Sequence, residues 1–143
     1  MKTIYTISLG LFLFVTFSCT NSHKKSLTVK GKVPEVELEK GSQIYRAKCM
    51  NCHRKNGEGL PKVFPPLAQS DFLENELEEA IRMVKYGSGK EIIVNGQKYK
   101  SYMPSSGLND RDITLVFNYI LNSWGNEYGL IKVETVTNIK EKK

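Results

Sequence analysis

Two cysteines and a histidine lie close together in the run Cys49-Met50-Asn51-Cys52-His53. Thiols at this spacing sit about one helical turn apart and can add to the two vinyl groups on one side of a haem, with the next imidazole directed at the iron. A Cys-x-x-Cys pair can also serve thiol redox chemistry or half of a zinc site. The flanking residues lack the βαβ pattern expected of a thiol redox protein. For a zinc site, only Cys19 and His23 remain as further ligands. We therefore predict covalent haem attachment through Cys49 and Cys52, with His53 as an iron ligand.

The segments on either side of this motif must hold it in place. Residues 37–48 are predicted to form a helix, interrupted by Gly41 in a way that often signals close packing. Residues 56–59 (Asn-Gly-Glu-Gly) predict a turn after the attachment helix. Residues 64–67 (Phe-Pro-Pro-Leu) are expected to be rigid and extended, because proline fixes its own φ and restricts its predecessor.

The remaining elements are predicted from apolar residues at helical or alternating spacing. Capping residues and turns mark where these elements begin and end. These are a helix that starts at Asn75 and stops at Gly87, a hairpin of residues 91–94 and 97–99, a helix from Asn109 to a C-cap at Gly125, and a short helix within the tail at residues 126–143.

Residues 1–18 have the form of a secretory signal, with Lys2 followed by an apolar run too short to span a membrane comfortably. Export agrees with c-type haem, which is attached outside the bacterial cytoplasm. Cys19 stands where a lipoprotein signal places its acylated cysteine, although Thr16 replaces the usual leucine. We predict a lipid on Cys19, which would hold the protein at the periplasmic side of a bacterial membrane. The alternative is ordinary cleavage after Ser18, which leaves Cys19 as a free thiol.

The formal net charge of +6 is concentrated outside the predicted domain. Residues 19–36 form a polar segment, predicted to be a flexible tether, that holds four lysines against one glutamate. Residues 36–125 hold twelve basic and eleven acidic side chains. Nucleic-acid binding requires a basic stripe on the folded domain, so this balance argues against it. The tether lysines could contact anionic lipid headgroups or simply keep the segment solvated.

Residues 37–125 form the predicted folded domain, with no internal repeat. A core of this size is marginal without additional stabilisation. A buried haem would supply the missing apolar contacts, so we expect the haem-free chain to be largely unfolded.

Over about residues 38–125 the chain resembles class I cytochromes c. Residues 41–53 resemble the first helix and haem motif of that family, residues 64–67 its proline segment, residues 101–104 (Ser-Tyr-Met-Pro) its axial-methionine loop, and residues 110–124 its closing helix. The stretches VFPPLA, VNGQ-x-Y and NSWGN are similar to bacterial single-haem cytochrome domains, including those fused to copper nitrite reductases.

This resemblance implies an all-α, class I cytochrome c fold, a small helical domain wrapped around one covalently attached haem c. Its N- and C-terminal helices would cross at Gly41, beneath Tyr119 or a neighbouring aromatic residue. The resemblance also makes His53 and Met103 the axial iron ligands, with the Pro65 carbonyl orienting His53.

The other methionines are weaker candidates for the distal position. Met103 lies on a non-helical loop before Pro104, whereas Met50 lies inside the attachment loop. Met83 falls in a helical stripe, where methionine is more often core filler than a ligand. Four further residues could pack against the haem or be ordinary core: Leu67, Ile93, Tyr99 and Tyr102.

Two filled axial positions leave one-electron exchange as the expected function. We predict an electron carrier between redox proteins of a respiratory chain, such as a membrane complex and a terminal reductase or oxidase. No paired carboxylates, nucleophile–base pair or phosphate loop indicates an enzyme. Two alternatives are a haem-based ligand-binding or sensor module, and a fixed cytochrome subunit of an oxidase or reductase complex.

The charge pattern suggests how such a carrier could dock. Residues 46–62 and residues 82–100 each hold five basic side chains and one acidic one, while residues 71–79 are acidic. One hypothesis is a basic rim near the haem edge that steers the domain to an acidic partner. The alternative is that these charges only solvate a small domain.

Overall fold

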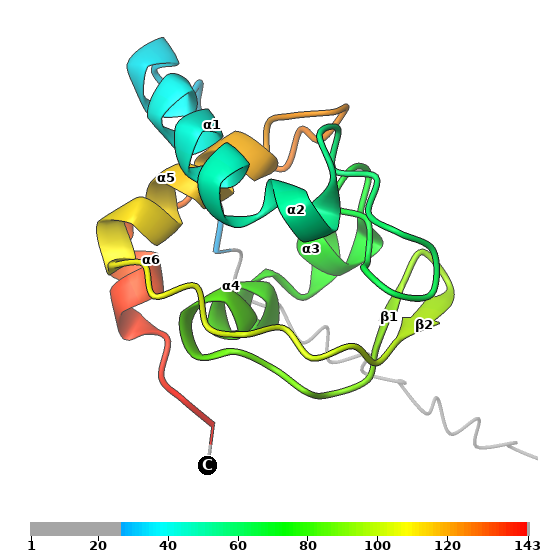
Figure 1. Cartoon of the computed structure of the whole chain (residues 1–143). Coiled ribbons are helices and arrows are strands. Elements are labelled where there is room, and N and C mark those ends of the chain that lie inside the picture. Colours follow the sequence, from blue (N-terminus) through cyan, green and yellow to red (C-terminus); the bar gives the residue numbers. More distant parts are fainter. Residues whose placement is uncertain (1–26, 143) are drawn as a thin grey trace, which may run out of the picture.

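The computed structural model describes residues 27–142, and two helices from the two ends of the domain form its frame. Helix α1 (Glu35–Lys48) packs across helix α5 (Asp110–Ile120), as Figure 1 shows. The buried side of α5, which includes Ile113 and Phe117, faces the core that the other elements complete. The crossing therefore joins the helix predicted at residues 37–48 to the helix predicted to begin at Asn109.

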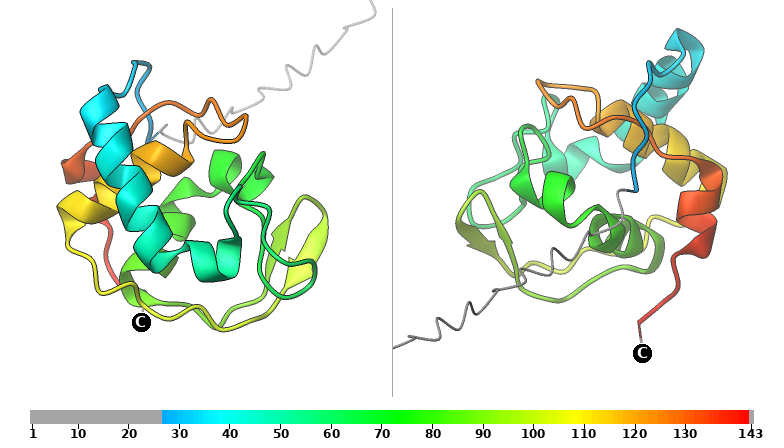
Figure 2. Two further views of the ribbon diagram at one scale, coloured as in Figure 1. Left: turned by 45° about the horizontal axis from the view of Figure 1, so that its top comes forward. Right: turned by 180° about the vertical axis from the view of Figure 1, so that it is seen from behind.

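The remaining elements surround the space beside this frame (Figures 1 and 2). They are α2 (Met50–His53), α3 (Asp71–Asn75), α4 (Leu77–Tyr86), β1 (Ile92–Val94), β2 (Gln97–Tyr99) and α6 (Val133–Asn138). The two strands pair antiparallel, with Ile92 opposite Tyr99, as the predicted hairpin requires. In the described part of the chain the fold is thus helical apart from one small hairpin, which confirms the predicted fold class.

Gly41 allows the two frame helices to approach closely. A Cβ atom at Gly41 would overlap the backbone oxygen of Leu115 and lie 2.7 Å from the Cβ of Tyr119. A backbone carbonyl cannot move aside as the end of a flexible side chain can. The crossing predicted beneath Tyr119 is therefore present, and it requires a residue without a side chain.

Two predicted helix boundaries are wrong. Asn75 does not cap α4 but ends α3, a short helix that the sequence pattern did not predict, and its Nδ2 donates to the Asp71 carbonyl at 2.8 Å. Helix α5 ends at Ile120, before the predicted C-cap at Gly125. The Ile120 carbonyl accepts from the Asn126 side chain at 2.8 Å and from the Ser123 amide at 3.3 Å, so this end is satisfied without a glycine turn.

Asn109, in contrast, begins α5 as predicted. Its side-chain oxygen accepts a hydrogen bond from the Asp112 amide at 2.9 Å, and its Nδ2 donates to the Asp112 carboxylate at 3.0 Å. This reciprocal pairing satisfies an amide that the first helical turn leaves without a partner.

The tether prediction is wrong for residues 27–36, which pack onto the domain. Val29 and Leu130 exchange two backbone hydrogen bonds, at 2.8 and 3.1 Å, and Val33 is only 3% exposed. Figure 2, seen from behind, shows this entering segment beside the chain that follows α5. The apolar side chains of Leu27 and Val33 explain the packing of this otherwise polar segment, whereas Val29, which is 43% exposed, joins through its backbone. The predicted signal at 1–18, Cys19 and the rest of the tether before residue 27 lie outside the described residues.

The tail after α5 also packs onto the domain. The short helix predicted there is α6, and Val136 and Ile139 are buried in the main core. Within residues 27–142, no helix has both the length and the apolar content needed to cross a membrane.

Replacing Gly41 with alanine is expected to destabilise the haem-loaded protein by about 1–3 kcal/mol, because the new methyl group must push α1 away from the α5 backbone. Denaturant unfolding followed by circular dichroism measures the loss. Gly89→Ala is the matched control, since a Cβ there meets only Tyr102 Cδ2 at 3.7 Å. Equal stability of both variants would contradict the close approach at Gly41.

Candidate haem site

The two cysteines are placed by the junction of α1 and α2. Cys49 follows the last residue of α1 and precedes α2, while Cys52 lies inside α2. The His53 amide donates to the Cys49 carbonyl at 2.9 Å, so Cys49 and His53 are one helical turn apart. Both thiols are free and line the same cavity. Burial, with a smaller contribution from Cys52, raises the pKa of the Cys49 thiol to about 11, so this thiol is neutral at pH 7.

His53 is buried, and a backbone acceptor holds its ring. Its Nδ1 lies 2.9 Å from the Pro65 carbonyl oxygen, which can only accept, so Nδ1 carries the proton and Nε2 is left as a metal-binding nitrogen. Burial lowers the pKa of His53, and the Pro65 hydrogen bond opposes this shift only in part. The neutral ring is the form that binds iron. The hydrogen bond that the family resemblance implied is therefore present.

Hydrogen bonds also hold the loop that carries Pro65. The Gly57 carbonyl accepts from the amides of Leu67 and Ala68, at 2.7 and 3.0 Å, and the Gly59 amide donates to the His53 carbonyl at 3.0 Å. Gly57 has a φ of 67° and packs against the Trp124 ring, where a Cβ would collide. This turn returns the chain so that the proline segment lies beside the histidine.

An aromatic cluster supports the same junction from the α5 side. The Tyr45 ring lies 5.6 Å from that of Tyr119 and 4.9 Å from that of Trp124, between centroids. The Tyr45 hydroxyl donates to the Arg54 carbonyl at 2.6 Å, just after α2. Burial is the main cause that raises the pKa of Tyr45 well above its usual range, so the phenol stays protonated and keeps this bond.

Met103 reaches the same cavity from the loop that follows β2. Its amide and carbonyl exchange hydrogen bonds with Ser88, both at 2.8 Å, and the Ser106 amide donates to the Val84 carbonyl at 2.9 Å. The loop is thus tied to the end of α4. Figure 1 shows α2 above and this loop below the central space.

Cys49, Cys52, His53 and Met103 therefore line one cavity of about 290 Å³. Its wall is mostly apolar, with residues from the proline segment, α3, α4, the hairpin and α5: Leu67, Phe72, Leu73, Ala80, Val84, Ile92, Val94, Phe117 and Ile120. Two thiols, a neutral imidazole, a thioether and an apolar wall are the donor set and surroundings that a covalently held haem needs, so the residues present fit the group.

The structure corrects one predicted packing residue. Leu67 lines the cavity, and Tyr99 and Tyr102 line a smaller one that shares His53 and Met103 with it. Ile93, however, is 55% exposed, and Ile92 lines both cavities instead. Side chains alternate along a strand, so Ile92 and Val94 share the inward face. The alternation was readable in the sequence, but which face turned inward was not.

A second methionine, Met83, also reaches the cavity. It lies on α4 and lines both cavities, so the described residues place two thioethers, those of Met83 and Met103, along this wall. The helical stripe indicated only that Met83 would be buried. Among residues 27–142, no group of three or more His, Cys, Asp or Glu side chains is arranged to hold a metal ion.

Part of the hypothesis of a basic rim is also wrong. The Arg82 side chain is nearly buried and pairs with Glu78 and Glu79, and Lys85 pairs with Asp110 at 2.7 Å. These two cations are paired with carboxylates of the same domain, so they do not form part of a basic docking surface.

The model of the cytochrome c family matches residues 38–124, which contain all of these features. The chain belongs to the cytochrome c family. As a class I c-type cytochrome it carries covalently attached haem c, and Cys49 and Cys52 fit the attachment motif.

Two kinds of curated protein are similar to this cytochrome. It is 41% identical over 91 residues to cytochrome c-552 of Thermus thermophilus, an alignment that covers 60% of this chain and 69% of that one. A second cytochrome c-552 of the same species is aligned over 61% of its length. The chain is also 31% identical over 104 residues to the cytochrome c subunit of a quinone alcohol dehydrogenase from Gluconacetobacter polyoxogenes. That alignment covers 71% of this chain but only 22% of the subunit.

Replacing both attachment cysteines, as in Cys49→Ala/Cys52→Ala, is expected to leave a largely unfolded cytochrome. Without haem the apolar wall has no partner, and a domain of this size cannot offset that loss. Far-UV circular dichroism and a thermal scan measure the effect, with the haem-loaded wild type as reference. A well-folded variant with a cooperative transition would contradict the expectation.

Proposed function

We propose that this cytochrome is a single-haem electron carrier, and not an enzyme, with His53 and Met103 as the axial iron ligands. The observation that supports the proposal is that both side chains line one apolar cavity with the attachment cysteines. Bound haem supplies one-electron chemistry at iron. Two protein ligands would leave no open position for oxygen or peroxide, and a neutral thioether sulfur would raise the reduction potential relative to two histidines.

The protein contributes rigidity to this chemistry. Pro65 fixes the ring of His53, Ser88 fixes the backbone at Met103, and the apolar wall limits water near the iron. Ligands that stay in place in both oxidation states keep the reorganisation energy of electron transfer small. The smaller cavity is lined by Tyr102, which is 72% exposed, and by the exposed Lys90. This cavity therefore opens to solvent, and an electron could enter or leave the domain there.

We further propose that electron transfer takes place outside the cytoplasm, at the periplasmic side of a bacterial membrane, between respiratory-chain proteins. The sequence supports this location through the signal pattern at residues 1–18 and the lipid-acceptor position of Cys19. A second candidate is a fixed cytochrome subunit of a dehydrogenase or oxidase complex. The similarity to cytochrome c subunits of quinone alcohol dehydrogenases favours it, and copurification of a membrane partner would identify it.

Met103→Ala is expected to open the iron to carbon monoxide. The reduced wild type should show sharp low-spin bands that carbon monoxide does not move, whereas the reduced variant should bind it readily. Met83→Leu is the matched control, because it removes the other thioether of the cavity wall and should leave the wild-type spectrum unchanged. If the wild type itself binds carbon monoxide, Met103 is not the ligand and a gas-binding or sensing function takes its place.

Lys48 and Lys90 are expected to steer an acidic redox partner to the cavity edge, because both are exposed and line a cavity. Electron transfer from a small acidic flavoprotein should slow as salt rises, and Lys48→Gln/Lys90→Gln should slow it further at low salt. Arg111→Gln, on the exposed side of α5, removes a charge away from both cavities and serves as control. Rates that do not change with ionic strength would rule out steering.

A further inference from the structure

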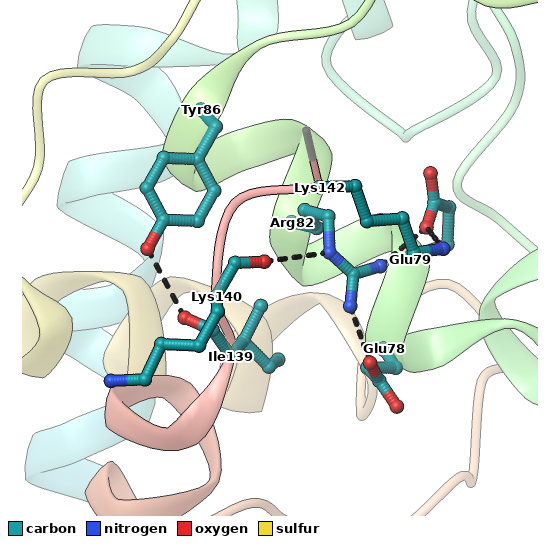
Figure 3. Close-up of polar contacts among 7 residues, drawn as sticks. All are labelled: Glu78, Glu79, Arg82, Tyr86, Ile139, Lys140 and Lys142. Carbon is teal, nitrogen blue, oxygen red and sulfur yellow. Dashed lines mark hydrogen bonds and ion pairs between the residues drawn. The ribbon is translucent and has the colours of Figure 1, made fainter.

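The C-terminal strap, defined here as residues 136–142, is attached to α4 through its backbone (Figure 3). The Lys85 ammonium donates to the Val136 carbonyl at 3.1 Å, and the Tyr86 hydroxyl donates to the Ile139 carbonyl at 3.1 Å. The Lys142 ammonium pairs with the Glu79 carboxylate at 2.6 Å. Because Val136 and Ile139 are also buried in the core, polar and apolar contacts hold the strap along the same helix.

Arg82 is the centre of this attachment. Its Nε donates to the Lys140 carbonyl at 2.9 Å, while its two terminal nitrogens donate to Glu78 and Glu79. Each of the three guanidinium nitrogens thus donates to a protein oxygen, and only 10% of the side chain is exposed. A buried cation held in this way keeps both its carboxylates and the strap in fixed positions.

The other side of α4 faces the haem cavity. Met83 and Val84 are in the cavity wall, next in sequence to the strap contacts at 82 and 85. The end of α4 also holds the Met103 loop, because the Val84 carbonyl accepts from the Ser106 amide and the Lys85 carbonyl accepts from the Ser105 hydroxyl at 2.8 Å. One helix of ten residues thus joins the strap to the distal wall.

We propose that Arg82 is a positioning residue for the distal ligand: by clamping the strap onto α4, it holds the Met103 loop against the haem and slows the release of Met103 from the iron. The inference rests on the proposed ligation by Met103. Arg82 does not touch the haem site, since it is absent from the cavity lining, and acts only through α4. The C-terminal residues then control how easily an outside ligand reaches the iron.

Binding of imidazole to the oxidised, haem-loaded protein tests this, because the neutral imidazole can bind only after Met103 leaves. Stopped-flow absorbance should show that Arg82→Met binds imidazole at least about tenfold faster than the wild type, as expected for a more frequent local opening. The matched control is Arg46→Met, the same change at an exposed position of α1, which should stay within about twofold. Tyr86→Phe removes one strap bond and should give an intermediate rate.

A chain that ends at Asn138 tests the strap if Arg82→Met does not fold. It removes the Ile139, Lys140 and Lys142 contacts but leaves Arg82 paired with its two carboxylates, and it should also bind imidazole faster. Folded variants that bind at the wild-type rate would overturn the inference.

The Met103→Ala variant distinguishes a failure of the inference about Arg82 from a failure of the proposed ligation by Met103. If wild type and Met103→Ala bind imidazole equally fast, Met103 is not a ligand. If Met103→Ala is fast while the wild type and all strap variants are slow, the ligation stands and only the role of Arg82 is wrong.

Discussion

The close approach of α1 and α5 at Gly41 is the constraint on which the rest of the structure depends. It fixes the direction in which α1 delivers Cys49 to the start of α2. It also fixes which side of α5 is turned to the cavity, where Phe117 and Ile120 form part of the wall. A single missing side chain therefore sets the relation between the attachment motif and the surface against which the haem packs. The Tyr45, Tyr119 and Trp124 rings fill the space beside this crossing and support it.

The sequence was most informative where a short local pattern has one physical solution. The spacing of Cys49, Cys52 and His53 corresponds to one helical turn, and Asn109 with Asp112 defines a helix start, so both could be read without tertiary information. The long-range contacts, such as Gly41 under Tyr119 and His53 on Pro65, came from resemblance to a family. Nothing in the local residues specifies which glycine meets which helix, or which carbonyl meets an imidazole.

Two of the errors share a cause, which is that the deciding partner lies far away in the chain. Val29 finds its backbone partner in Leu130. Arg82 was counted as a surface charge because its neighbours in sequence are charged, yet its third partner is a carbonyl 58 residues away. A backbone carbonyl has the same chemistry in every residue, so contacts of this kind leave no pattern in the amino-acid sequence.

The pairing of Val29 with Leu130 has a mechanical consequence. The chain enters the domain through this two-bond bridge and the buried Val33 before it reaches α1. A pull on the chain upstream of residue 27 would therefore first load the bridge, which is anchored in the segment after α5. Tension in the incoming chain would therefore reach the helix that carries Cys49 only after these two hydrogen bonds had broken.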